Sequence, residues 1–177
     1  EVLVETVLKL DLPEDARVVD LGTGTGAIAL SLASERPEWV IVASDIYAPT
    51  LEVAKYNAEQ HDIENVEFVL GSWLKPFGRQ FFDVIASNPP YIDPDDAHMQ
   101  HLATEPQRAL VADKKGLADL EDIIIQAKKH LTVNGWVVLE HGYDQADAVQ
   151  HLFKQAGYKK VRTVKDYGGN DRVTLGQ

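Results

Sequence analysis

The sequence predicts an α/β protein built on a doubly wound, mostly parallel sheet of seven strands. Short apolar runs alternate with helical segments of roughly 10–15 residues, the pattern of a parallel sheet with helices on both faces. The first five runs are almost entirely apolar, as strands covered on both faces should be. The last two runs are separated only by residues 165–171, so we expect them to form an antiparallel hairpin at one edge.

The first half of the chain supplies three of the expected helices and four of the strands. Residues 2–10 place Val and Leu on one helical face, and residues 25–34 are rich in Ala and Leu. Residues 49–61 begin with Pro49, which is favoured in a first helical turn. The expected strands are the apolar runs 17–21, 40–44, 66–70 and 82–87.

The second half continues the alternation. We expect helices over residues 117–131 and 145–156, with Gly157 closing the second of them. The fifth strand covers residues 136–140. The last two strands, 159–164 and 172–175, flank the turn Asp166-Tyr-Gly-Gly-Asn-Asp.

Composition limits the class of protein. With 177 residues and 45% hydrophobic side chains, we expect residues 1–177 to form one domain with a buried core. Apolar runs stay far below the roughly 20 residues that span a bilayer, and the chain does not start with a secretion signal. The chain contains no cysteine, which excludes disulfides and thiolate metal sites and fits the reducing cytoplasm.

The net charge of −11 bears on the substrate. Asp and Glu outnumber Lys and Arg by 28 to 17, whereas phosphate binding requires a basic surface. We therefore expect a protein or small-molecule substrate and no direct nucleic acid binding. The short apolar runs predict no membrane contact, and no metal is expected because His98 and His101 lie at no convincing metal-ligand spacing.

A glycine-rich loop joins the first strand to the first helix after it. It reads Asp20-Leu-Gly22-Thr23-Gly24-Thr25-Gly26, and glycines there let the backbone approach a ligand closely. The loop also fits a dinucleotide fingerprint, so a nicotinamide cofactor is one interpretation. The acidic residue two positions before the first glycine favours S-adenosylmethionine, whose ammonium group Asp20 would meet directly or through water.

Three further residues follow the second and third strands. Asp45 ends the second strand, where an acidic side chain accepts hydrogen bonds from ribose hydroxyls in either class of fold, although it could instead cap the next helix. Ser72 and Trp73 follow the third strand, where the adenine should lie. Ser72 would bond the adenine edge, and Trp73 would either stack on its face or pack in the core.

The fourth strand leads directly into Asn88-Pro89-Pro90-Tyr91. Two prolines restrict the backbone and remove two donors, so this loop is stiff and presents one carboxamide, free carbonyls and an aromatic ring. Such a set suits a planar NH2 group: the Asn88 oxygen and the Pro89 carbonyl accept its hydrogens, and Tyr91 stacks on its plane. The loop therefore indicates a methyltransferase that acts on an amide or amine nitrogen, and a nicotinamide oxidoreductase would leave it without a purpose.

With these motifs assembled, the chain resembles the release-factor glutamine methyltransferase family (PrmC/HemK), whose domain is a Rossmann-like class I S-adenosylmethionine-dependent methyltransferase. The resemblance also covers Leu139-Glu-His-Gly and Asp166-Tyr-Gly-Gly-Asn-Asp-Arg-Val. It implies methyl transfer to the side-chain nitrogen of the Gly-Gly-Gln glutamine in class 1 peptide-chain release factors, leaving S-adenosylhomocysteine.

The resemblance also assigns residues. It implies that the glycine loop, Asp45, Trp73 and Asn88 contact the cofactor, and that residues 88–91 bind the glutamine. Two departures stand out: the family's N-terminal helical docking domain is absent from this chain, and Ser72 replaces an Asp common among relatives. Methylation of an exocyclic amine of adenine or guanine is the alternative, which the net charge disfavours. His141, after the fifth strand, is either a catalytic base or, as we favour, a residue that stabilises its loop.

Overall fold

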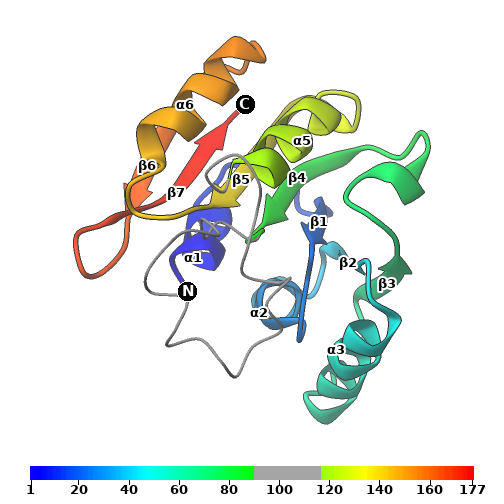
Figure 1. The fold of residues 1–177 in the computed structure, drawn as a ribbon. Coiled ribbons are helices and arrows are strands. Elements are labelled where there is room, and N and C mark those ends of the chain that lie inside the picture. The colour runs from blue at the N-terminus through cyan, green and yellow to red at the C-terminus, as the bar shows by residue number, and fades with distance from the viewer. Residues whose placement is uncertain (90–116) are drawn as a thin grey trace.

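The computed structural model describes residues 1–89 and 117–177 and contains one seven-stranded sheet (Figure 1). The strand order is β3-β2-β1-β4-β5-β7-β6, and the strands from β3 to β5 in this order run parallel, whereas β7 is antiparallel to both of its neighbours. The strands are β1 (Arg17–Leu21), β2 (Val40–Asp45), β3 (Val66–Leu70), β4 (Phe82–Ser87), β5 (Leu131–Glu140), β6 (Arg162–Lys165) and β7 (Asp171–Gly176). The predicted fold class, including the antiparallel hairpin at one edge, is confirmed.

Helices cover both faces of this sheet. They are α1 (Val2–Leu8), α2 (Ala27–Glu35), α3 (Ala48–Gln60), α5 (Ala118–Ala127) and α6 (Ala146–Gln155), with a 3₁₀ turn η1 (Lys75–Phe77). Neighbouring strand residues point to opposite faces, so Val18 packs with α1 and α2 while Val19 packs with α5 and α6. The core therefore has two layers separated by the sheet, and each is made of buried aliphatic side chains together with a few aromatic ones.

Three boundaries differ from the sequence-based expectation by three residues or more. The helix predicted over 117–131 ends at Ala127, and β5 begins at Leu131, where a register shift opposite β4 leaves Val133 99% exposed. The strand predicted to start at residue 159 starts at Arg162, because Lys160 adopts a φ of 50° that an extended strand does not allow. Lys159 still pairs with Gln177 through two backbone hydrogen bonds of 2.7 and 2.8 Å.

Gly157 closes α6 as the sequence predicts. With φ of 80° it follows the last helical residues, and its N–H donates to the carbonyl of Lys154 while that of Tyr158 donates to Phe153. This is the paired hydrogen bonding of a Schellman motif. The Phe153 and Tyr158 rings, 5.1 Å apart and edge to face, supply the accompanying apolar contact.

The order of the strands places a crevice between β1 and β4. From β1 the chain moves outward to β2 and β3, then returns to β4 on the other side of β1 and continues to β5. Ligands of such sheets bind outside the carboxyl ends of the strands at this reversal. The glycine loop leaves β1 here, and Asn88 leaves β4 here. None of the described helices is long and apolar enough to cross a membrane.

Candidate active site

The two predicted motifs start side by side at the reversal of the sheet. Leu21 and Ser87, the last residues of β1 and β4, are register partners, so Gly22 and Asn88 are the next residues of adjacent strands. The buried Ser87 hydroxyl donates a hydrogen bond of 2.6 Å to the Leu21 carbonyl and ties the two strand ends together. Asn88, the first residue of the predicted substrate loop, therefore begins beside the glycine loop.

The glycine loop needs its glycines. Gly22, Gly24 and Gly26 have φ angles of 68°, 58° and 87°, in the left-handed region that disfavours side chains. A Cβ built on Gly24 would meet no described residue within 4 Å, whereas one on Gly22 would lie 3.4 Å from the Trp73 ring. Gly24 thus presents bare backbone that no described residue covers, as close approach of a ligand requires.

Asp20 is buried directly beneath this loop. Its Oδ2 accepts hydrogen bonds from the Thr23 hydroxyl at 2.6 Å and from the Ala29 N–H at 3.2 Å. Because Gly26 begins α2 without a capping side chain, Asp20 provides the acceptor for the first turn of that helix from the neighbouring strand. Burial raises the pKa of Asp20 to about 7, although both hydrogen bonds oppose this shift.

Asp45 fixes the other side of the loop. Its Oδ2 accepts from the Gly24 N–H at 3.1 Å, and its Oδ1 accepts from the N–H of Tyr47, the residue before α3. Asp45 therefore holds the glycine loop and the start of α3 at once. Sequence reasoning treated a capping role as an alternative to ligand binding. In the structure Asp45 bonds the N–H of Tyr47, the N-cap residue, and α3 itself has no side-chain cap hydrogen bond.

The segment after β3 also reaches the loop. The Gly71 N–H donates to the Asp45 carbonyl at 2.9 Å, and Trp73 follows with a φ of 46° that is unusual for a bulky residue. This strained conformation brings the half-buried Trp73 ring against Gly22. Ser72 is also half-buried, with no hydrogen bond from its hydroxyl to any described residue.

The remaining predicted loop residues differ in exposure. The Thr23 side chain is buried and directed at Asp20, whereas Thr25 is exposed and its carbonyl accepts a hydrogen bond of 2.9 Å from the Asn57 amide. Thr23 therefore shapes the loop from within. Asn88 is exposed and Pro89 is buried, while Pro90 and Tyr91 lie outside the described residues.

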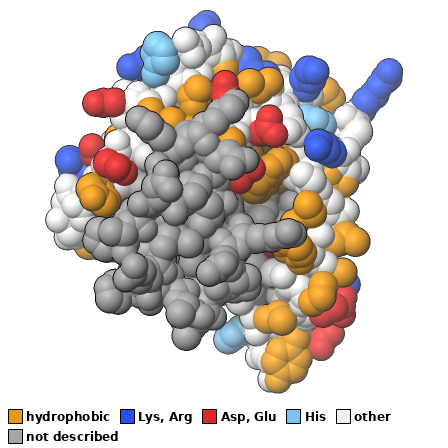
Figure 2. All heavy atoms as spheres, in the orientation of Figure 1, with side chains coloured by type: hydrophobic (Ala, Val, Ile, Leu, Met, Phe, Trp, Pro, Cys, Tyr) orange, Lys and Arg blue, Asp and Glu red, His pale blue; other side chains and the backbone are white. Residues whose placement is uncertain are grey.

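Two apolar residues at this edge were missed by sequence reasoning. Ile46 directly follows β2 and is 57% exposed. Leu70 is the last residue of β3 and is 56% exposed. Because Asp45 and Leu70 are register partners, the two lie beside the expected ribose and adenine position. Figure 2 shows hydrophobic side chains gathered on the side of the molecule where β3 and α3 lie. The sequence signal that could have identified Ile46 is its position directly after Asp45, the acidic residue that ends β2.

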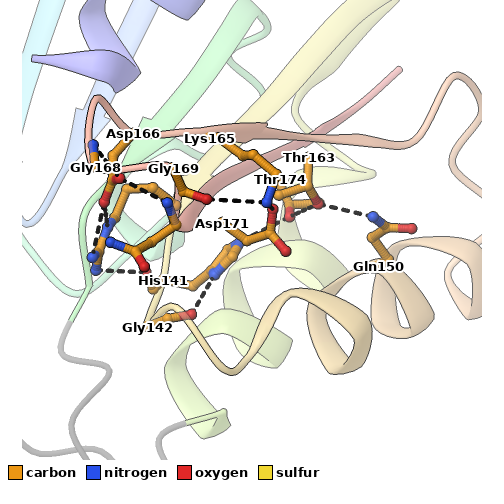
Figure 3. Close-up of polar contacts among 12 residues, drawn as sticks. His141, Gly142, Gln150, Thr163, Lys165, Asp166, Gly168, Gly169, Asp171 and Thr174 are labelled. Carbon is orange, nitrogen blue, oxygen red and sulfur yellow. Dashed lines mark hydrogen bonds and ion pairs between the residues drawn. The ribbon is translucent and has the colours of Figure 1, made fainter.

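His141 belongs to a buried polar chain and offers no free nitrogen (Figure 3). Its Nδ1 lies 2.8 Å from the Gly142 carbonyl, which can only accept, so Nδ1 carries the proton and Nε2 accepts from Thr174 at 2.8 Å. Thr174 then accepts from Thr163, and Thr163 accepts from Gln150. Burial lowers the pKa of His141, in agreement with a neutral ring. This is the loop-stabilising role, not that of a base.

Arg172 connects the hydrogen-bonded series that starts at His141 to the β6–β7 turn. Its guanidinium donates to one Asp166 oxygen through two nitrogens, each at 3.2 Å, and to the His141 carbonyl at 3.3 Å. Asp166 also accepts from the N–H groups of Gly168 and Asn170 at 2.9 Å. The turn therefore has one fixed shape at the carboxyl end of β5. Among the described residues no group of three or more His, Asp or Glu could hold a metal ion.

The fold and the site define a methyltransferase domain of the doubly wound class. Three observations fit S-adenosylmethionine at this edge: the bare backbone of Gly24, the Asp20 oxygen without a partner, and the carboxylate of Asp45 at the end of β2. The family profile described as "Methyltransferase small domain" matches residues 1–115. The chain belongs to this family.

Relatives and solved structures agree with this assignment. A release factor glutamine methyltransferase from Yersinia pestis is 51% identical over the whole chain, and one from Aliivibrio fischeri is 46% identical. The chain spans 64% and 63% of the lengths of these two relatives. A methyltransferase structure from Pyrococcus furiosus superimposes with a TM-score of 0.73 at 22% identity, covering 98% of this chain and 78% of that one. The resemblance that the motifs predict is thereby confirmed.

Proposed function

We propose that this chain transfers a methyl group from S-adenosylmethionine to the side-chain amide nitrogen of the glutamine in the Gly-Gly-Gln motif of peptide-chain release factors. The observation that carries the proposal is the adjacency of Asn88 to the glycine loop, fixed by the Ser87–Leu21 contact. The names of the relatives support the same substrate. S-adenosylmethionine, when bound, supplies the electrophilic methyl group.

The cofactor is held by residues from three strand ends. The loop glycines, Gly22, Gly24 and Gly26, let the backbone approach the cofactor, and Thr23 and Thr25 lie between them. Asp20 receives the ammonium group of the cofactor. Asp45 accepts from the ribose hydroxyls with one of its oxygens, in exchange for or beside its contact with Gly24. Ser72 and Trp73 line the adenine position, and the adenine also contacts the exposed Ile46 and Leu70.

The glutamine is oriented by residues 88–91. The Asn88 oxygen and the Pro89 carbonyl accept the two hydrogens of the glutamine NH2 group, while Pro90 keeps the loop stiff and Tyr91 stacks on the amide plane. A carboxamide nitrogen is a weak nucleophile because its lone pair is delocalised. The two acceptors aim that lone pair at the methyl group and stabilise the positive charge that develops on nitrogen.

No strong base is required. The methylated amide is acidic enough to give its proton to water, and His141 has both nitrogens engaged. The partner is a class 1 release factor, which places the reaction in the cytoplasm. We further propose that residues 1–177 act as one catalytic domain.

Mass spectrometry of a release factor incubated with the chain and S-adenosylmethionine tests this proposal. We expect one added methyl group on the Gly-Gly-Gln peptide and none on a variant factor with the glutamine replaced by alanine. A parallel incubation with labelled cofactor and RNA or DNA serves as the competing arm. Label found only in the nucleic acid would instead support methylation of an exocyclic amine and overturn the proposal.

A further inference from the structure

The two carboxylate oxygens of Asp20 have different surroundings. Oδ2 accepts from Thr23 and Ala29, whereas Oδ1 is buried and has no hydrogen-bond partner among the described residues. The side chain as a whole has 0% of its surface exposed. An ionised carboxylate in this position would leave one oxygen without solvent and without a donor, which is costly.

The electrostatic surroundings add to that cost. The charged group that acts on Asp20 is Asp45, which faces it from β2 and disfavours a second negative charge. No Lys, Arg or His of the described chain contributes a compensating positive charge. Thr23 and the first turn of α2 favour ionisation, but burial outweighs them and raises the pKa of Asp20 to about 7.

We propose that Asp20 is a neutral carboxylic acid in the free protein below neutral pH and that the ammonium group of the cofactor ionises it on binding. The inference rests on the proposed function, because it takes the cofactor to be S-adenosylmethionine or its product. When the ammonium arrives at Oδ1, the O–H bond of Asp20 breaks and its proton leaves for solvent. The ammonium keeps its own protons and forms a charge-assisted hydrogen bond to the carboxylate.

The sign of the pH dependence follows from this exchange. Below about pH 7 most of the free protein carries the Asp20 proton and must lose it to bind, so affinity rises with pH toward 7 and then levels off. From the ionised fractions, S-adenosylhomocysteine should bind roughly tenfold more tightly at pH 7.0 than at pH 5.5. The amino group of the ligand stays protonated across this range.

Calorimetric titration of the full chain with S-adenosylhomocysteine tests the inference. Repeating it at about pH 6 in buffers of different ionisation enthalpy should reveal release of nearly one proton per ligand bound. Asp20→Asn is the matched variant, since its amide can accept from Thr23 and Ala29 while placing an NH2 group where the protonated oxygen was. It should bind more weakly than the wild type at both pH values, with an affinity that does not change between pH 5.5 and 7.0, so that its deficit grows roughly tenfold over this range, and it should release no proton.

Thr23→Val gives a second test should Asp20→Asn fail to fold. Loss of the 2.6 Å hydrogen bond removes a group that favours ionisation, so the rise in affinity should move to higher pH. Equal wild-type affinity at pH 5.5 and 7.0, with an enthalpy independent of buffer, would overturn the inference. Absence of binding at every pH would instead contradict the proposed function.

Discussion

Substitutions at Gly24 and Gly157 distinguish an effect on ligand binding from an effect on stability. Gly24 and Gly157 both have positive φ angles, and a Cβ on either meets nothing within 4 Å. Replacing either with alanine should lower the free energy of unfolding by about 1 kcal/mol, because both are left-handed. Only Gly24→Ala should weaken S-adenosylhomocysteine binding, by at least roughly tenfold, since its methyl group would occupy the ligand's path.

Urea unfolding and calorimetry on the two variants check this. Gly157 lies at the end of α6 and serves as the control for backbone strain. Equal losses of affinity in both variants would mean that strain, and not the ligand's path, explains the glycine loop.

The Ser87 hydroxyl joins the cofactor side of the site to the substrate side. It is fully buried and donates to the Leu21 carbonyl. Ser87→Ala should lower the free energy of unfolding by about 1–2 kcal/mol, because a buried acceptor loses its donor. It should also slow methyl transfer by letting Gly22 and Asn88 shift relative to each other.

Exposed Ser31 provides the control for this change. Its hydroxyl donates to the Ala27 carbonyl within α2, so Ser31→Ala should change stability by less than about 0.5 kcal/mol. Thermal unfolding and a methyl-transfer assay measure both effects. Unchanged stability and rate in Ser87→Ala would show that the two loops do not depend on this bond.

At the scale of elements, the polar chain from His141 holds β5, β7, β6 and α6 together. Thr174→Val removes the donor to the buried His141 and should cost about 1–3 kcal/mol of stability, because it leaves a buried ring nitrogen unpaired. Thr163→Val should cost less, since Thr174 can still donate to His141. Chemical denaturation gives both values. A larger loss of stability from Thr163→Val than from Thr174→Val would contradict the donor and acceptor roles assigned to these hydroxyls.

Element boundaries show where sequence patterns stop being informative. Strands 17–21, 66–70 and 82–87 were predicted with their observed ends, because short, mostly apolar runs mark the strands of a parallel sheet. The helix from 117 was extended too far because Leu131 continues an apolar pattern that helix and strand share. Its strand role depends on pairing with Phe82, a contact distant in sequence.

At the scale of the whole molecule, one sheet separates two core layers. Val7 of α1 lies in one layer and Ile123 of α5 in the other, and both are fully buried. Val7→Ala should cost about 2 kcal/mol from two lost methyl groups, and Ile123→Val about 1 kcal/mol. Because the residues lie on opposite faces, the double variant should show the sum within about 0.5 kcal/mol in one cooperative transition.

Denaturant unfolding followed by two probes measures this. Fluorescence and far-ultraviolet circular dichroism should give coincident curves for all three variants. Two separate transitions would contradict a single cooperative domain.

The candidate site was largely predictable because its motifs lie at strand ends. The alternation of elements already brings Asp20, Asp45 and Asn88 to one edge of a parallel sheet. The roles of individual atoms were not predictable, since they depend on contacts across the sequence. The hydrogen bond from the Tyr47 N–H to Asp45, the engagement of both His141 nitrogens and the exposure of Ile46 are of this kind.

Methyl transfer by Asn88→Ala tests the central claim most directly. The account predicts that transfer to the Gly-Gly-Gln glutamine falls by roughly 10²–10³-fold, the scale of losing one group that stabilises developing charge. S-adenosylhomocysteine affinity, measured on the same preparation by calorimetry, should change by only a few-fold. Wild-type turnover by this variant would contradict the claim that the Asn88 loop presents the substrate amide to the methyl donor.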